Sequence, residues 1–266
     1  MLTVARLTLR RLRSEGVLCL GLSVVLTTAT LLLCVQVEAA RSSDTLGRWM
    51  DLVSYDLSAL VLVPVLVAIV IGTSVVASEF DRATAVFAWS VAPSRRRWLL
   101  DVLFVGALAV LIASLPLAVA AELLTRSVGT TAISASLISL DPSAALVLAR
   151  AVAAFGVTAV VGFVTRRSLP TFLLGMLVTC LLLGAVEFGF EAWREAAALP
   201  IDPSVGGLYF VFNRVVEGNG FLILEPYGLE PAARTGILVA QTAATLLVAA
   251  LSVVPAVALV EERRPA

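Results

Sequence analysis

Few residues in this sequence of 266 amino acids could carry out chemistry. There is no histidine and all 19 basic residues are arginine, which excludes an imidazole proton shuttle and a lysine that cradles phosphate or forms a Schiff base. The cysteines fall inside apolar runs without metal-ligand spacing and indicate small buried side chains (Cys19, Cys34 and Cys180). The sequence therefore predicts no catalytic residue, no metal site and no cofactor bound by this chain.

Charged residues are scarce in the long apolar segments. A secondary transporter usually binds its coupling ion through an acidic residue inside the membrane, and five of the six apolar segments contain no charge. Arg150 lies within the remaining segment, where its long side chain could snorkel to the interface, and Glu187 stands just beyond the fifth. The chain is thus expected to lack an energy source of its own.

The amino-acid composition indicates that membrane-spanning helices position the few polar residues of this chain. The sequence is 60% hydrophobic and only 14% charged, whereas soluble proteins are nearer half apolar and a quarter charged. One globular core of this size could not bury the excess, but a bilayer could, and a spanning helix needs about 20 apolar residues. The sequence predicts a single transmembrane domain over 1–266 with spans at 16–37, 57–78, 102–121, 144–165, 168–186 and 235–260.

The arginines predict the orientation of these spans. Twelve lie in one set of alternating loops, which includes both ends of the chain, and six lie in the other set. The remaining arginine, Arg150, lies within a span. Because cytoplasmic loops carry the excess of basic residues, both termini are expected in the cytoplasm. Residues 1–15 predict an amphipathic helix at the membrane surface, in contact with lipid, and the first apolar run is too long for a cleaved signal peptide. The predicted fold class is an all-α polytopic membrane protein with six transmembrane helices and an N-terminal interfacial helix; the zero net charge suggests no nucleic-acid partner.

The predicted cytoplasmic loop at 79–101 is too long and too apolar for a simple hairpin. Charged residues end the second span, residues 84–91 predict a short helix with two aromatic side chains, and a Pro-Ser-Arg turn leads back to the membrane. Exposed aromatic residues indicate docking against protein or lipid, although an interfacial helix beside a positive cluster explains them equally well. The residues that carry this interpretation are Glu79, Asp81, Arg82, Thr84, Phe87, Trp89, Pro93, Ser94, Arg95, Arg96 and Arg97.

This loop resembles that of the type-2 permeases of ATP-binding cassette (ABC) exporters. In that family a glutamate at the end of the second span precedes a small residue and a threonine, followed by a coupling helix and a Pro/Ser/Arg turn. Glu79, the pair Ala83–Thr84 and the turn Pro93–Arg95 stand at those positions here. The family often has glycine where Ala83 stands, and a lysine at the start of the third span that this chain lacks. The resemblance extends to the six spans, the cytoplasmic termini and a long outer segment at 187–234.

The resemblance implies the permease subunit of an ATP-driven exporter, a multi-pass protein of the bacterial inner membrane. Two permease subunits, identical or different, would pair, and each would bind a separate ABC ATPase subunit that holds ATP and Mg²⁺, because this chain has no P-loop motif. Residues 79–97 would couple that ATPase to the helices. In the family the outer segment carries short re-entrant helices that shape an external gate. Here they would cover 206–216 and 220–229, with the aromatic residues Phe210, Phe212, Phe221 and Tyr227.

Two other functions are compatible with the residues. One is a secondary transporter or small-solute carrier, which would produce a proton- or sodium-dependent flux without a partner. The other is a membrane anchor or assembly subunit that binds a partner but transports nothing. For a transporter, the apolar spans favour a cargo that is at least partly hydrophobic.

Overall fold

The computed structural model describes residues 2–40, 46–77, 80, 94–128, 142–200, 209–218 and 221–262. Within these ranges the chain forms six long α-helices, a π-helical turn and three strands. All six helices are long and apolar enough to cross a bilayer, which confirms the predicted class of a six-helix membrane protein. The helices are α1 (Leu2–Ala40), α2 (Leu46–Gly72), α5 (Arg95–Val128), α6 (Ala144–Thr165), α7 (Ser168–Ala197) and α8 (Pro231–Glu262).

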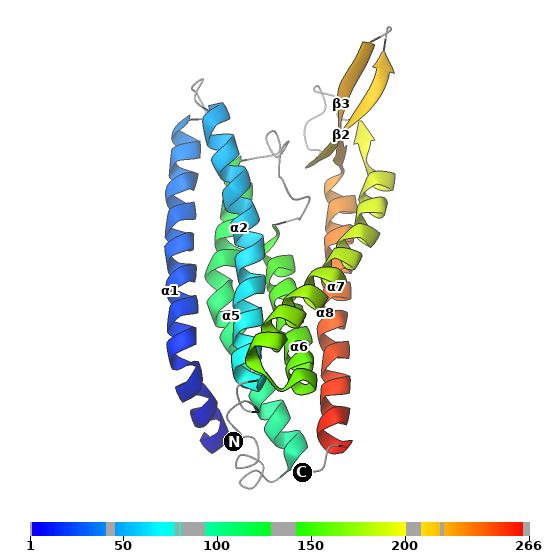
Figure 1. Ribbon diagram of the computed structural model, residues 1–266. Helices are drawn as coiled ribbons and strands as arrows, with labels where there is room; N and C mark the ends of the chain where they lie inside the picture. Colours follow the sequence, from blue (N-terminus) through cyan, green and yellow to red (C-terminus); the bar gives the residue numbers. More distant parts are fainter. Residues whose placement is uncertain are drawn as a thin grey trace.

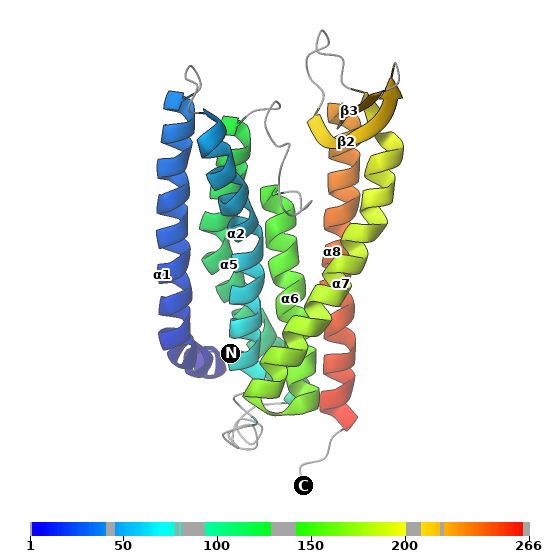
Figure 2. The same cartoon turned by 45° about the horizontal axis from the view of Figure 1, so that its top comes forward.

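The six helices form one bundle with α6 at its centre (Figures 1 and 2). Helix α6 packs against α2, α5, α7 and α8, whereas α1 lies at one side against α2 and α5. The start of α1 and the end of α8 lie at the same end of the bundle, here called the terminal end, and the strands lie at the opposite end, called the strand end (Figure 1). The arginine distribution predicts that the terminal end faces the cytoplasm.

Apolar side chains cover much of the outside of the bundle. Phe104 on α5 and Leu169 on α7 are each 70% exposed, and Val254 on α8 is 65% exposed. In water, apolar patches of this extent would promote aggregation, but in a bilayer they face lipid tails of the same polarity. The core beneath them joins α2, α5 and α6 through residues such as Ile69, Leu99 and Ala154.

Several helices extend beyond the charge-free stretches that predicted the spans. Helix α5 begins at Arg95, inside the loop predicted at 79–101, and α7 continues to Ala197, inside the outer segment predicted to begin at 187. A charge-free stretch estimates only the part embedded in hydrocarbon, because helical hydrogen bonding continues into the headgroup region. The first turns of α1 bend away from its long axis (Figure 2), as an interfacial N-terminal helix would.

A small antiparallel sheet occupies the strand end between α7 and α8. Strands β1 (Leu199–Pro200) and β2 (Tyr209–Gly218) both pair with the central strand β3 (Phe221–Leu229). The re-entrant helices implied at 206–216 and 220–229 are therefore wrong for the described part of those segments. Aromatic and β-branched residues on both sides of an Asn-Gly dipeptide favour a β-hairpin over a helix.

Candidate functional site

Three charged side chains and one amide meet between α6, α7 and α8, and this group is called the polar cluster: Arg150, Glu187, Arg194 and Gln241. Oε1 of Glu187 accepts hydrogen bonds from Nη2 of Arg150 and from Nε2 of Gln241, the latter at 2.7 Å. Oε2 of Glu187 accepts from Nη2 of Arg194, also at 2.7 Å. Arg150 is only 3% exposed and Gln241 only 1%. A charge that is buried to this extent requires a partner. Glu187 is that partner for Arg150, and its contacts with Arg150 of α6 and Gln241 of α8 link these two helices to α7.

The polar cluster lies in the half of the bundle nearer the strands. Arg150 stands six residues after the start of α6, which places it about 9 Å from that end at 1.5 Å per residue. The expectation that Arg150 snorkels to the interface is wrong, because its buried guanidinium bonds to Glu187 instead. The sequence contained a signal for this pair, since both charges lie at similar depth on neighbouring helices. The fifth span is predicted to end at residue 186, before the first charge, and therefore does not include Glu187.

Helix α2 carries another carboxylate into an apolar segment. Asp56 stands just before the predicted span at 57–78, but α2 begins at Leu46 and is apolar enough to span from Leu52 onward. The Asp56 side chain is half-buried, and Thr30 of α1 is its neighbour. Its Oδ2 atom is buried and has no hydrogen-bond partner within the described part of the chain. The predicted second span begins at residue 57 and therefore leaves out this carboxylate, which lies within the apolar part of α2.

Glycine residues bring α2 and α7 close to α6 at Thr158. A Cβ atom added to Gly72 would lie 3.1 Å from Cβ of Thr158, and one added to Gly175 would lie 3.0 Å from both Oγ1 and Cγ2 of that threonine. Thr158 is fully buried, and its hydroxyl has no hydrogen-bond partner among the residues that the structure describes. Small residues permit this close approach of transmembrane helices, so this level of the bundle is a tight helix crossing.

Helix α2 ends in the π-helical turn η1 (Thr73–Ala77), which packs on α6. Val76 of this turn is fully buried, and a Cβ atom added to Gly162 of α6 would lie 3.1 Å from its Cγ1 atom. Single π-helical turns are rare and often occur at functional sites. Here the turn lies directly before the segment predicted to couple to an ATPase.

Phe80, at the start of that segment, is held by the connection between α6 and α7. Its ring meets the ring of Phe163 edge-on with centroids 5.6 Å apart, and the guanidinium carbon of Arg166 lies 5.7 Å from the Phe80 centroid. Arg166 has a left-handed backbone (φ 57°), and its N–H donates to the carbonyl of Gly162, which closes α6. A displacement of Phe80 would therefore act directly on the terminal ends of α6 and α7.

The other end of the predicted coupling segment starts α5. Oγ of Ser94 accepts a hydrogen bond from the N–H of Arg97 at 3.1 Å, as an N-cap does. Arg95, Arg96 and Arg97 occupy the first helical turn, where cations oppose the helix dipole, so the stability of α5 does not explain them. The remaining predicted coupling residues lie outside the described part of the chain: Glu79, Asp81, Arg82, Thr84, Phe87, Trp89 and Pro93.

The aromatic residues predicted for an external gate fall on the sheet. Phe212 of β2 is paired with Tyr227 of β3, and Phe210 is paired with Gly228, near the base of the hairpin. Phe221 pairs with Gly218 at the opposite end of the same hairpin. The structure thus brings Phe212 and Tyr227 together and separates Phe221 from them.

Fold and contacts together define a multi-pass membrane protein with a buried polar cluster and a terminal-end segment attached to α6 and α7. Among the residues that the structure describes, no group of three or more His, Cys, Asp or Glu side chains could hold a metal ion. The family model for "ABC-2 membrane transporter related" proteins matches residues 17–194, about two thirds of the chain. The chain therefore belongs to this family of ABC transporter permeases, as its loop residues indicated.

The matched range runs from residue 17 in α1 to Arg194 in α7, and so includes all three charged members of the polar cluster. The sheet and α8 lie outside it. Membership of the family implies in general a partnership with an ABC ATPase subunit. Searches of curated proteins and of solved structures gave no significant match.

Proposed function

We propose that this chain is the permease subunit of an ATP-driven ABC exporter in the bacterial inner membrane. Two such subunits, identical or different, form the transmembrane pathway, and each binds a separate ATPase subunit that holds ATP and Mg²⁺ at the terminal end. The observation that carries the proposal is the family match over residues 17–194, which includes the whole predicted coupling segment at 79–97.

The contacts of Phe80 support a mechanical connection from that segment to the helices. Phe80 touches Phe163 and Arg166 at the terminal end of α6. From Phe163 to Arg150, α6 runs 13 residues, or about 20 Å, as one continuous helix. At Arg150 the polar cluster joins α6 to α7 and α8. A push on Phe80 would thus be passed along α6 to α7 and α8 through one contiguous set of contacts, the kind of network that carries coupling between distant sites.

The composition of the assembly tests the proposal first. Native mass spectrometry after mild detergent extraction from the source membrane should yield two permease-sized chains with two ATPase-sized chains. A lone chain or a homodimer in every detergent tried, with no ATPase recovered, would contradict the proposal.

The coupling role is tested with Phe80→Ala in the assembled transporter. We expect the variant to lose several-fold in transport-coupled ATP hydrolysis while it stays in the membrane, because the terminal end of α6 and its cap Arg166 lose their contact with the Phe80 ring. Phe188→Ala is the matched control, since that side chain is 78% exposed on the outside of α7. Equal coupling in both variants would refute the role of Phe80. Replacement of Trp89 or of Arg95–Arg97 should uncouple transport in the same way.

Asp56 gives the carrier alternative a specific residue. Its Oδ2 atom, buried and without a partner among the described residues, offers a ligand for a proton or sodium ion within α2. A proton- or sodium-driven flux in vesicles that contain only this chain, lost in Asp56→Asn, would favour the carrier and count against the exporter.

A further inference from the structure

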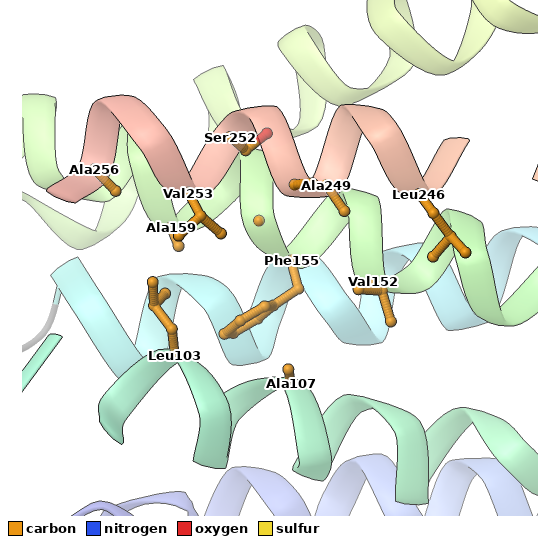
Figure 3. A pocket seen from close by; sticks show the side chains of 12 residues that line it. Leu103, Ala107, Val152, Phe155, Ala159, Leu246, Ala249, Ser252, Val253 and Ala256 are labelled. Atoms are coloured by element: carbon orange, nitrogen blue, oxygen red, sulfur yellow. The ribbon is translucent and has the colours of Figure 1, made fainter. Parts of the chain in front are cut away.

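An apolar cavity of about 280 Å³ lies between α5, α6 and α8 (Figure 3). Ala107 of α5, Phe155 and Gly156 of α6, and Ala249 of α8 are among its lining residues. Ser252 also lines it, but its hydroxyl donates to the carbonyl of Val248 at 2.8 Å within its own helix. The wall therefore presents hydrocarbon and offers no free hydrogen-bond donor.

Small residues create this space. Alanine and glycine occupy lining positions on all three helices, and the ring of Phe155 turns toward α5 (Figure 3). A Cβ atom added to Gly106 of α5 would lie 2.5 Å from Cζ of Phe155, so the ring already lies flush against that glycine. The Phe155 ring thus bounds the cavity on the side of α5, and the free space lies beside α8.

The chemistry of the wall selects an apolar occupant. A buried water molecule needs two to four polar partners, and an apolar cavity of roughly 150 Å³ in another protein stays dry and takes up benzene instead. An empty apolar space also forfeits the dispersion contacts of the atoms around it. Hydrocarbon is therefore the ligand class that fits.

The depth and the surroundings of the cavity indicate where that hydrocarbon comes from. Along α8 the lining extends from Leu246 to Ala256, ten residues or about 15 Å, which is roughly half the thickness of the hydrocarbon core. Leu247 of α8 and Phe104 and Leu108 of α5 stand next to lining residues and are exposed at the outside of the bundle. The cavity is thus next to surfaces that lipid tails already cover, within one leaflet.

We propose that this cavity binds one acyl chain of a phospholipid from the leaflet at the terminal end. The chain inserts laterally between α5 and α8, with its end against Phe155 and Gly156, and wedges these two helices apart. The headgroup stays at the membrane surface, because the cavity has no polar partner for it. This inference concerns the isolated chain and holds whether or not the chain works with an ATPase.

A photo-crosslinking experiment on the purified chain tests the site. The chain is reconstituted in vesicles of phosphatidylethanolamine and phosphatidylglycerol that contain phosphatidylethanolamine with a diazirine in the middle of one acyl chain. We expect label on the α6 peptide that contains Gly156 and Ala159, which are buried and out of reach of lipid at the outer surface. Ala250→Phe, which adds a ring at a lining position of α8, should reduce that label several-fold.

Val254→Phe is the matched control, because this residue lies on α8 four positions away and is 65% exposed outside the cavity. It should leave the label on α6 unchanged. Ala107→Phe fills the cavity from α5 and replaces Ala250→Phe if that variant does not fold. Label confined to exposed residues, or equal label on α6 in the filled and control variants, would overturn the proposal. Native mass spectrometry of the same proteins gives a second measurement: one phospholipid mass retained by the wild type and the control, and lost from the filled variants.

Discussion

Replacement of Glu187 by leucine should be among the most destabilising single changes in the described part of the chain. The carboxylate accepts hydrogen bonds from Arg150, Arg194 and Gln241, and its own side chain is only 16% exposed. Loss of one partner of a buried ion pair costs about 3–5 kcal/mol, because it leaves the other charge buried and uncompensated. Arg194 is 13% exposed near the end of α7 and can turn toward the interface, so Arg150 carries most of this penalty.

A second variant separates the penalty for an unpaired charge from the loss of packing. Arg150→Met/Glu187→Leu removes both charges and keeps apolar volume, and such replacements of buried ion pairs are often neutral. We therefore expect the double variant to recover about 2 kcal/mol relative to Glu187→Leu. Gln241→Leu removes one hydrogen bond to the charged carboxylate and should cost about 1.5–3 kcal/mol.

Equilibrium unfolding in detergent micelles measures these differences, with size-exclusion profiles to show that each variant is folded at the start. A loss below about 1 kcal/mol for Glu187→Leu would mean that water reaches Arg150 in the folded protein. Strictly additive effects of Arg150→Met and Glu187→Leu would mean that the two side chains do not interact. Either result would refute the reasoning that the polar cluster holds α6, α7 and α8 together.

Two further predictions concern close packing and the start of α5. Gly175→Ala should cost about 1–3 kcal/mol, because its Cβ atom would lie 3.0 Å from Thr158 and force that side chain to move. Gly184→Ala on the same helix has no atom within 4 Å and should be neutral or slightly stabilising; equal thermal unfolding of the two variants would contradict the packing argument. Ser94→Ala should cost about 1 kcal/mol and speed hydrogen exchange in the first turn of α5, whereas Ser127→Ala, whose hydroxyl donates to Leu124 at the other end of that helix, should leave the turn unchanged.

The sequence predicted the architecture because membrane helices follow simple rules. A run of about 20 apolar residues has few alternatives to a spanning helix, since every backbone polar group must be hydrogen-bonded in lipid. The range predicted for the fourth span, 144–165, has the same ends as α6 even though it contains Arg150. The loop residues also predicted the family that the match over 17–194 then established.

The predictions were weaker wherever they depended on charge alone or on resemblance alone. The outer segment was expected to hold re-entrant helices by resemblance, although the dipeptide Asn219–Gly220 between two apolar runs is itself a hairpin signal. The rule that a span ends at its first charge placed Glu187 outside the membrane and Asp56 before the second span. In the outer segment the local sequence predicts the observed strands, whereas the resemblance to the family implies helices.

The sequence by itself determined the number of helices, their membrane environment and the scarcity of catalytic chemistry, because hydrophobicity and residue type are local properties. Only the tertiary structure decided which side chains meet. Arg150, Glu187 and Gln241 are separated by 37 and 54 residues along the chain, and the contact of Phe80 with Phe163 and Arg166 joins segments that are still farther apart. The cavity between α5, α6 and α8 depends on how three helices are spaced around Phe155. Rotation and spacing of helices come from the packing of all of them at once, and no single apolar stretch encodes that.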